Sequence, residues 1–343
     1  MEVSLKIADD AKQWDTLLAR ASYRTIFHTW KWLKIVEKDT NTKLYPLIGF
    51  KGTDPIGIFP LFYQKKGFLK IVLSPPKQSA PYLGPLIIDY ESMKQGKRES
   101  TLFEFLKAVD HFIFSELKCT HSRIRSSSGL LDSRPFLWNG YEVEPMYTLI
   151  LDLGKNLDDI WESFDKVLRK NINGTLKERV SVEEGSIEDL DFLHSSIIKR
   201  LKEKGFEQSK NKSYLYDIFK SFFPQNLRIF IAKYEGERVG GLLVTSYDNK
   251  VSALFGTPKI TMKGIYPNDL IHWEAIKLAK ENGFRYYELV DTGEFQRLCT
   301  YKSQFNPNLS VWFSATKYSS RSVKFIQKSY TLARKKLTHE HIN

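Results

Sequence analysis

Two stretches of the chain share one pattern of apolar and polar positions. Residues 45–62 and 229–244 each read as an apolar strand, a short polar turn containing glycine, and a second apolar strand. Ile56-Gly57 in the first stretch corresponds to Val239-Gly240 in the second, an offset of 239 − 56 = 183 residues. A helix and a further strand follow later in each copy. The pattern therefore predicts two tandem α/β domains.

Apolar periodicity and capping residues predict the elements around these two hairpins. The first copy should contain helices at about 11–18, 30–38 and 101–117, with Thr29 as an N-cap, and a strand at 122–125. The second should contain one helix running from about 158 through 176, helices at about 187–204, 214–223 and 269–282, and a strand from 285. We expect domains at 1–153 and 154–316, followed by a basic C-terminal helix and tail at 317–343.

The segment 74–85 is predicted to be a long ordered loop. It contains four prolines and Gly84, a density that excludes regular structure. Loops of this length inside compact domains are usually functional or disordered. Tyr82 lies among stiff residues, so we expect it to form a wall of a binding cleft; a simple crossover loop is the alternative.

The charge of the chain favours anionic partners. Its 343 residues include 52 Lys plus Arg and 40 Asp plus Glu, a formal net charge of +12. Nucleic acid, nucleotide or phospholipid would suit such a surface, although solubility alone also accounts for it. From Lys317 to Lys336 there are seven basic residues and no acidic one. Apolar residues at helical spacing within this tail predict an amphipathic helix docked by one face.

Several common functional classes are excluded by what the sequence lacks. It has two cysteines, no phosphate-loop or dinucleotide-binding fingerprint, no nucleophile elbow and no His-Glu-x-x-His pair. The seven histidines are scattered, so no metal site is expected. No stretch approaches the roughly 20 apolar residues of a membrane span, and the N-terminus lacks an apolar signal core. We therefore expect a cytoplasmic location.

The remaining order of hairpin, strand, loop, helix and strand resembles the core of the GNAT acyltransferase fold. More specifically, the chain resembles the FemAB-type family of peptidoglycan aminoacyltransferases, which have two tandem GNAT-like domains. The resemblance rests on short segments in a shared order: Phe27–Lys34, Arg169–Ile172, Val182–Gly185, Tyr266–Ile276 and Thr300–Phe305. It implies an α/β (α+β) fold of two tandem GNAT-like domains, with mixed, mostly antiparallel sheets flanked by helices.

The resemblance also implies an activity and its residues. The family transfers an amino acid from aminoacyl-tRNA to an amine of a cell-wall precursor, without a permanently bound cofactor. Tyr301 and Lys302 resemble the pair beside the reacting ester, where an ammonium or hydroxyl would stabilise the oxyanion. Lys34 and Arg169 resemble groups that bind the acceptor's diphosphate. Tyr82, Tyr266 and Asn268 complete the expected acceptor site.

The proton acceptor is left open among Glu288, Asp291 and Glu294, any of which could equally be a structural carboxylate. The expected partners are aminoacyl-tRNA and an anionic small-molecule or lipid-linked precursor, with peripheral membrane contact and no DNA.

The chain departs from the family pattern at two places. Asn173 stands where the family has a second basic residue, and Val290-Asp291 stands where it has Gly-Gly after the penultimate strand. These departures leave the identity of the substrate open. One alternative is an acyl-CoA-dependent N-acyltransferase acting on a sugar amine or a polysaccharide precursor. However, residues 259–268 have one glycine and a proline where coenzyme A enzymes have a glycine-rich loop. The second alternative is a basic RNA-binding protein without catalytic activity.

Overall fold

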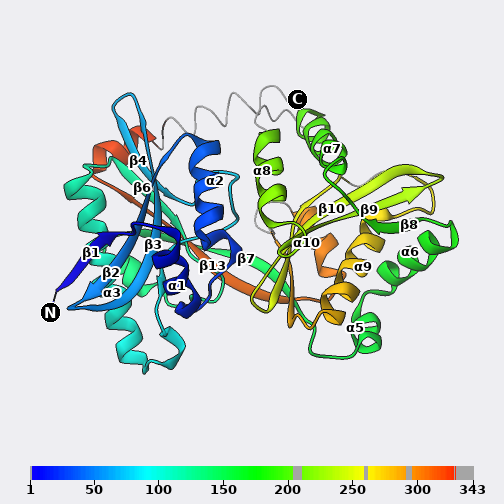
Figure 1. The fold of residues 1–343 in the computed structure, drawn as a ribbon, viewed down its shortest axis with the longest axis horizontal. Helices are drawn as coiled ribbons and strands as arrows, with labels where there is room; N and C mark the ends of the chain where they lie inside the picture. The colour runs from blue at the N-terminus through cyan, green and yellow to red at the C-terminus, as the bar shows by residue number, and fades with distance from the viewer. Residues whose placement is uncertain (1, 204–210, 259–261, 291–295, 328, 330–343) are drawn as a thin grey trace. The chain divides into compact units, whose positions relative to one another are not determined.

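The chain separates into two compact units. The computed structural model describes residues 2–203, 211–258, 262–290, 296–327 and 329 (Figure 1). The first unit comprises Met1–Met146 and Val311–Asn343, and the second comprises Tyr147–Ser310. The contacts thus assign residues 311–316 to the first unit, whereas the sequence pattern grouped them with the second.

The first unit is a mixed sheet with helices on its faces. In chain order it contains β1 (Val3–Ile7), α1 (Ala11–Arg20), α2 (Trp30–Thr40), β2 (Lys43–Lys51), β3 (Asp54–Lys66), β4 (Leu69–Ser74), β5 (Leu86–Ile87), α3 (Gln95–His111), β6 (His121–Arg125), α4 (Arg134–Trp138), the start of β7 (Glu142–Asp152) and most of β13 (Asn308–Tyr318). The strand order is β1-β2-β3-β4-β6-β13, and β5 pairs with β3. Only the β4–β6 pair among these described strands is parallel. Thr29 caps α2 as expected, its side chain accepting from Trp32 N.

The second unit repeats this arrangement. It contains the rest of β7, then α5 (Leu157–Ser163), α6 (Lys166–Lys177), β8 (Ser181–Glu184), α7 (Asp189–Glu203), α8 (Lys212–Phe222), β9 (Leu227–Tyr234), β10 (Glu237–Tyr247), β11 (Lys250–Gly256), α9 (Pro267–Glu281), β12 (Tyr286–Leu289) and α10 (Gln296–Ser303). The strand order is β7-β12-β11-β10-β9-β8. Here β11 and β12 are parallel, and α9 connects them in sequence, as α3 lies between β4 and β6.

The two hairpins match in register as well as in sequence. Lys51 pairs with Asp54 in the first, and Tyr234 pairs with Glu237 in the second, at the same 183-residue offset. In each hairpin the pairing then skips one residue of the second strand, Ile56 in β3 and Val239 in β10. Such a bulge bends the strand locally. The predicted repeat is therefore confirmed down to a single unpaired position.

The glycine after each bulge lets a helix approach the sheet. A Cβ on Gly57 would lie 2.7 Å from Phe105 Cε1 of α3, and one on Gly240 would lie 2.9 Å from Pro267 Cβ of α9. Both distances are too short for a real side chain. Glycine is therefore needed in both copies for the same reason.

The single helix expected from 158 through 176 is two helices, α5 and α6, so that prediction was wrong. Asn156 caps α5, with its side chain accepting from Asp159 N at 2.7 Å. Phe164 then turns to extended backbone, and Asp165 N donates to Gln304 O at 2.9 Å. The Phe164 ring packs against Trp273 and Phe305. This aromatic packing accounts for the break, which helical periodicity alone could not reveal.

The basic tail begins differently from the expectation. Lys317 lies in β13, and its ammonium donates to Asp110 Oδ2 and Asn139 O, both at 2.7 Å. A helix is described over residues 321–327, and Ile326, one of the apolar residues whose helical spacing predicted a docked face, is 53% exposed. Most of the expected tail helix, including residues 330–343, lies outside the described residues.

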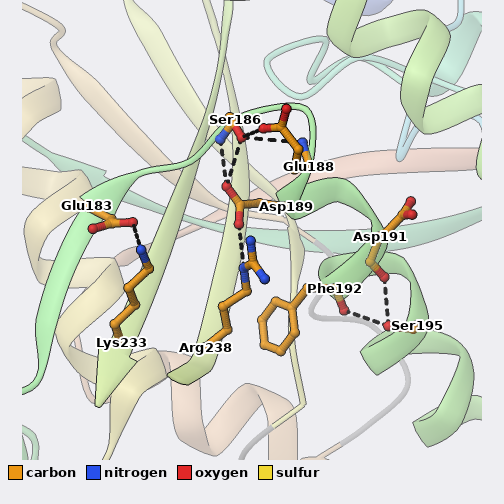
Figure 2. Close-up of polar contacts among 9 residues, drawn as sticks. All are labelled: Glu183, Ser186, Glu188, Asp189, Asp191, Phe192, Ser195, Lys233 and Arg238. Carbon is orange, nitrogen blue, oxygen red and sulfur yellow. Dashed lines mark hydrogen bonds and ion pairs between the residues drawn. The ribbon is translucent and has the colours of Figure 1, made fainter. Parts of the chain in front are cut away.

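The start of α7 is fixed by side chains around the turn that follows β8 (Figure 2). Asp189 accepts from Ser186 N at 2.7 Å and from Arg238 Nε at 2.6 Å. Next to this turn Glu183 pairs with Lys233 across β8 and β9. Residues 182–185 thus form the edge strand of this sheet and the turn after it. Among the helices in the described ranges, none combines the length and apolar character that crossing a bilayer requires.

Candidate functional site

A largely buried polar cluster in the second unit joins α6, α9, β12 and α10. Asp269 and His272 lie three residues apart on α9 and so share one helix face. Tyr287 belongs to β12, and Tyr301 and Lys302 belong to α10. We call Asn171, Asp269, His272, Tyr287, Tyr301 and Lys302 the α9 cluster.

Lys302 holds a positive charge at the carboxyl end of β12. Its side chain is buried, and Nζ donates to the main-chain oxygen of Val290, the residue directly after the strand. An ammonium carries three N–H donors, and one carbonyl engages a single one of them. Lys302 therefore places a desolvated positive charge, anchored to the main chain, at the end of the strand.

Tyr301 is a neutral hydrogen-bond donor within the α9 cluster. Burial, and then the neighbouring Asp269 carboxylate, raise the pKa of its hydroxyl well above the usual value. Asp269 is itself buried and accepts from Asn171 Nδ2 at 3.0 Å. The Tyr301 ring packs edge-on against Phe305. The phenol consequently keeps its proton, while the carboxylate beside it can accept one.

His272 is uncharged at neutral pH. Burial, and then the charge of Lys302, lower its pKa to about 3. Its Nδ1 forms a 2.8 Å hydrogen bond with the hydroxyl of Tyr287, a residue whose pKa is raised by burial. His272 therefore positions its neighbours and does not exchange protons near pH 7.

The N-terminus of α9 offers few backbone donors to an anion. Ile265, Tyr266, Asp269 and Leu270 donate their N–H groups to acceptors within this unit, and Pro267 has no N–H. The carboxylate of Asp269 also lies in the first turn, where the helix dipole favours negative charge. The described residues from 265 to 270 therefore offer few free N–H groups to a pyrophosphate such as that of coenzyme A.

Asn268 and Tyr266 lie at the same helix start. Asn268 donates from Nδ2 to Thr257 O at 2.9 Å, and its Oδ1 accepts from the Thr257 hydroxyl at 3.3 Å. Its amide therefore ties α9 to the residue that follows β11. Tyr266 precedes α9 and is half-buried, with its backbone N–H bound to Thr175 Oγ1.

The other expected site residues have local partners. In the first unit Lys34 is half exposed on α2 and pairs with Glu37, and Tyr82 is 1% exposed, its ring packing against Phe27 and Trp312. Tyr82 is thus a core residue of this unit. In the second unit Arg169 of α6 pairs with Glu162, while its Nε is buried without a hydrogen-bond partner.

Glu288 is a structural carboxylate. It is fully buried and accepts from Thr148 at 2.9 Å and from Ser252 at 3.0 Å, with Lys250 Nζ 2.8 Å away. Side chains alternate along a strand, so Glu288 faces away from its neighbour Tyr287 and from the α9 cluster. The other two carboxylates considered from sequence, Asp291 and Glu294, lie outside the described residues.

Sequence reasoning missed Asn171, Asp269, His272 and Tyr287 as members of the cluster. The signal for two of them was present, because Asp269 and His272 are polar residues on the buried face of an amphipathic helix. Asn171 gave no such signal, since its contact with Asp269 spans 98 residues of sequence. Within the described ranges, no group of three or more His, Cys, Asp and Glu could hold a metal ion.

Comparison with known proteins identifies the fold. Residues 163–303 match the family model of the acetyltransferase (GNAT) domain. The crystal structure of FemX superposes with a TM-score of 0.69 at 15% identity, covering 91% of this chain and 97% of FemX. L-PGS from Bacillus licheniformis gives 0.54 at 18% identity, covering 92% of this chain and 95% of that one. A tandem GNAT protein from the clavulanic acid biosynthesis pathway gives 0.53 at 12% identity, covering 93% and 99%.

No curated protein sequence matches the chain significantly. The structural likenesses, all at low identity, confirm the tandem GNAT-like fold and the FemAB-like resemblance of the architecture. The domain match bears out the predicted enzyme class, acyltransferase.

Proposed function

We propose that this chain, whose second unit carries an acetyltransferase (GNAT) domain, transfers an aminoacyl group from aminoacyl-tRNA to an amine of a cell-wall or glycan precursor. The observation that carries the proposal is the start of α9, where Tyr266 N and Asp269 N donate to acceptors of the chain itself, Pro267 has no N–H, and the Asp269 carboxylate lies in the first turn. An aminoacyl ester of tRNA, unlike a coenzyme A pyrophosphate, does not need free N–H groups on this helix.

The α9 cluster provides groups suited to aminolysis of an ester. The acceptor amine attacks the ester carbonyl carbon, a C–N bond forms, and the negative charge develops on the carbonyl oxygen. The Lys302 ammonium and the Tyr301 hydroxyl are the donors for this oxyanion. The C–O bond to the tRNA ribose then breaks, and the ribose oxygen takes up the proton that the attacking amine has lost, so it leaves as a hydroxyl.

We assign Asp269 as the general base, the group that accepts the proton of the attacking amine. It is the carboxylate of the cluster, it lies beside Tyr301, and Asn171 holds one of its oxygens. Glu288 is unsuited because its oxygens are occupied by two hydroxyls and an ammonium. A positioned carboxylate contributes about 10²–10⁴ in rate as a general base.

Lys34 and Arg169 remain candidates for binding an anionic acceptor. Each is a cation on a helix, and each is paired with a glutamate in this structure, so an incoming phosphate would have to replace that partner. The buried Nε of Arg169 without a partner favours the second of these sites.

An acyl-CoA-dependent N-acyltransferase is the second candidate, favoured by the acetyltransferase domain match. The two donors differ in charge. Binding of tRNA releases counterions, with a log–log slope against salt of about −0.7 to −0.9 per phosphate neutralised, whereas coenzyme A presents few phosphates.

The test is to measure the Kd of the full chain for aminoacyl-tRNA and for acetyl-CoA between about 50 and 200 mM salt. We expect saturable tRNA binding with a slope steeper than about −2, and no saturable binding of acetyl-CoA. A flat salt response together with saturable acetyl-CoA binding would replace our proposal with the second candidate.

A further inference from the structure

One face of β6 in the first unit carries a row of nitrogen-rich side chains. His121, Arg123 and Arg125 occupy alternate positions of the strand and so point to the same side of the sheet. Ile124, between the two arginines, packs into the core beneath α3. The row therefore lies on the opposite face of the sheet from α3. Across the pairing, Tyr318 of β13 stands beside His121.

Arg123 is a largely desolvated cation, and the described residues give it no ion pair. Burial, and then the charge of Arg125, lower its pKa, and only Tyr318 acts in the opposite direction. Its Nε is buried and has no hydrogen-bond partner. No carboxylate in the part of the chain that the structure describes forms an ion pair with Arg123. Folding has thus placed the guanidinium of Arg123 beside that of Arg125, whose charge opposes its own.

His121 adds a second unsatisfied polar atom on the same face. The residue is 8% exposed, and its Nδ1 is buried without a hydrogen-bond partner. Burial, and then the charge of Arg123, lower its pKa, so the ring is neutral near pH 7. The ring stacks on Tyr318 with centroids 5.7 Å apart. A neutral imidazole can donate one hydrogen bond to an anion without adding to the repulsion between the arginines.

Arg125 is held in place at the carboxyl end of β6. Its guanidinium lies 5.9 Å from the centroid of the Trp312 ring, and Nη1 donates to Pro81 O at 3.4 Å. The Arg125 main-chain oxygen accepts from Leu83 N at 2.9 Å. The loop after β4 therefore pairs with β6 where β4 itself has ended, and it fills the space between the two parallel strands.

The loop between β4 and β6 limits the directions from which a ligand can reach Arg123 and Arg125. Gly84 lies so close to β6 that a Cβ would be 2.8 Å from Ser126 Cα. An acyl chain has no room to pass between these strands, so a ligand has to reach the arginines from the side of the sheet on which they lie. Ligands of α/β sheets bind beyond the carboxyl ends of the strands, which is where Arg125 stands.

We propose that this face of β6 is a binding site for a phosphate- or diphosphate-bearing ligand, with Arg123 as the principal donor, Arg125 as the second cation, and His121 with Tyr318 as neutral donors. Planar guanidinium groups bind phosphate oxygens in pairs, and Arg123 and Arg125 lie on the same side of the strand. The site does not depend on the proposed donor or acceptor, because it needs only the first unit's own residues.

The test is isothermal titration of the full chain with inorganic phosphate, pyrophosphate and UDP. We expect saturable pyrophosphate binding that weakens about tenfold or more in Arg123→Gln and also in Arg123→Lys, which keeps the charge but loses the planar fork. Arg20→Gln is the matched control, since it removes an equal charge from an exposed residue of the same unit and should leave the Kd unchanged. Equal affinity for pyrophosphate and UDP would mean recognition of the phosphoryl groups alone, and tighter UDP binding would mean a nucleotide ligand.

A second readout separates binding from a structural role. Removing an unpaired buried charge should leave the thermal midpoint of ligand-free Arg123→Gln equal to or above that of the wild type. The proposal is overturned if the wild type binds none of the three anions, or if Arg123→Gln binds pyrophosphate unchanged. If Lys34→Gln or Arg169→Gln abolishes binding while Arg123→Gln does not, the anion belongs to the proposed acceptor site instead.

Discussion

The side-chain amide of Asn171 on α6 donates to the carboxylate of Asp269 on α9 across 3.0 Å. The bond fixes one oxygen of a buried carboxylate beside the Tyr301 hydroxyl. It also connects the two helices at the point where Tyr266 N donates to Thr175 Oγ1. A carboxylate held in this way keeps a single orientation within the α9 cluster, which is what a proton acceptor requires.

Asp269→Asn should abolish most of the activity with little change in fold. The substitution preserves the size of the side chain but removes its capacity to accept a proton, so we expect kcat to fall by about 10²–10⁴. Single-turnover measurements with aminoacyl-tRNA and an amine acceptor provide the check. Asp159→Asn, on the exposed start of α5, is the control. Retention of more than half of the wild-type kcat would exclude Asp269 as the proton acceptor.

Lys302→Met should lower kcat by about 10²–10³, the usual cost of losing one oxyanion donor. Methionine keeps much of the buried aliphatic volume, so the thermal midpoint should change little. Lys277→Met serves as the control, because Lys277 pairs with Glu274 on α9 and lies outside the α9 cluster. An unchanged rate in Lys302→Met would remove the ammonium from the mechanism.

Acid should destabilise the second unit through His272. The unfolded chain binds a proton at the ordinary histidine pKa of 6.5, whereas the native state resists protonation down to about 3. The unfolded state therefore binds more protons between these values, and stability falls with pH below 6.5. By pH 5.5 the loss from this group is about 1.4 kcal/mol.

Urea denaturation at pH 7.5 and 5.5 measures this loss, and His272→Gln should reduce the difference by about that amount. Other groups also titrate in this range, so His121→Gln is carried in parallel. An equal pH response in wild type and His272→Gln would contradict the assignment.

Glu288→Gln should destabilise the chain by up to about 3–5 kcal/mol, because it removes the buried carboxylate that pairs with the half-buried ammonium of Lys250. Replacing both residues, with Glu288→Gln and Lys250→Met, should recover part of the loss. The free energy of unfolding in urea tests both variants. If the double variant is as unstable as the sum of the single ones, the two groups act independently.

Gly57→Ala and Gly240→Ala should each destabilise by about 1–3 kcal/mol, because the new methyl groups would collide with Phe105 and Pro267. Gly96→Ala is the control. That glycine lies in α3, and a methyl group added to it would meet nothing within 4 Å, so alanine should stabilise by up to about 1 kcal/mol. Equal unfolding free energies for all three variants would show that the close approach tolerates a side chain.

The parts of the fold that follow from local chemistry could be predicted from sequence. A glycine turn between two apolar strands specifies a hairpin by itself, and Thr29 or Asn156 begins a helix through its own side chain. The break between α5 and α6 could not be predicted, because it depends on Phe164 meeting Trp273 and Phe305 from distant segments.

The candidate site shows the same limit. Tyr301 and Lys302 could be named from a short motif, but their meeting with Asp269 depends on how α9 and α10 pack. Lys317 reads as part of a basic tail, yet Asp110 and Asn139 hold it against the first unit. Charge composition indicates how many cations the chain has, and only the fold shows which of them are already neutralised.

The unpaired residues Ile56 and Val239 stand at the same step of their hairpins, so the two hairpin turns have the same backbone register. Because residues 51–57 and 234–240 have equal length and place their unpaired position at the same step, one can replace the other without changing which side of the sheet any later residue faces. In a chimera that carries the exchanged segment, each residue of the strand therefore keeps its side chain on the same face of the sheet. An insertion or deletion of one residue here would instead turn every later side chain of the strand to the opposite face of the sheet.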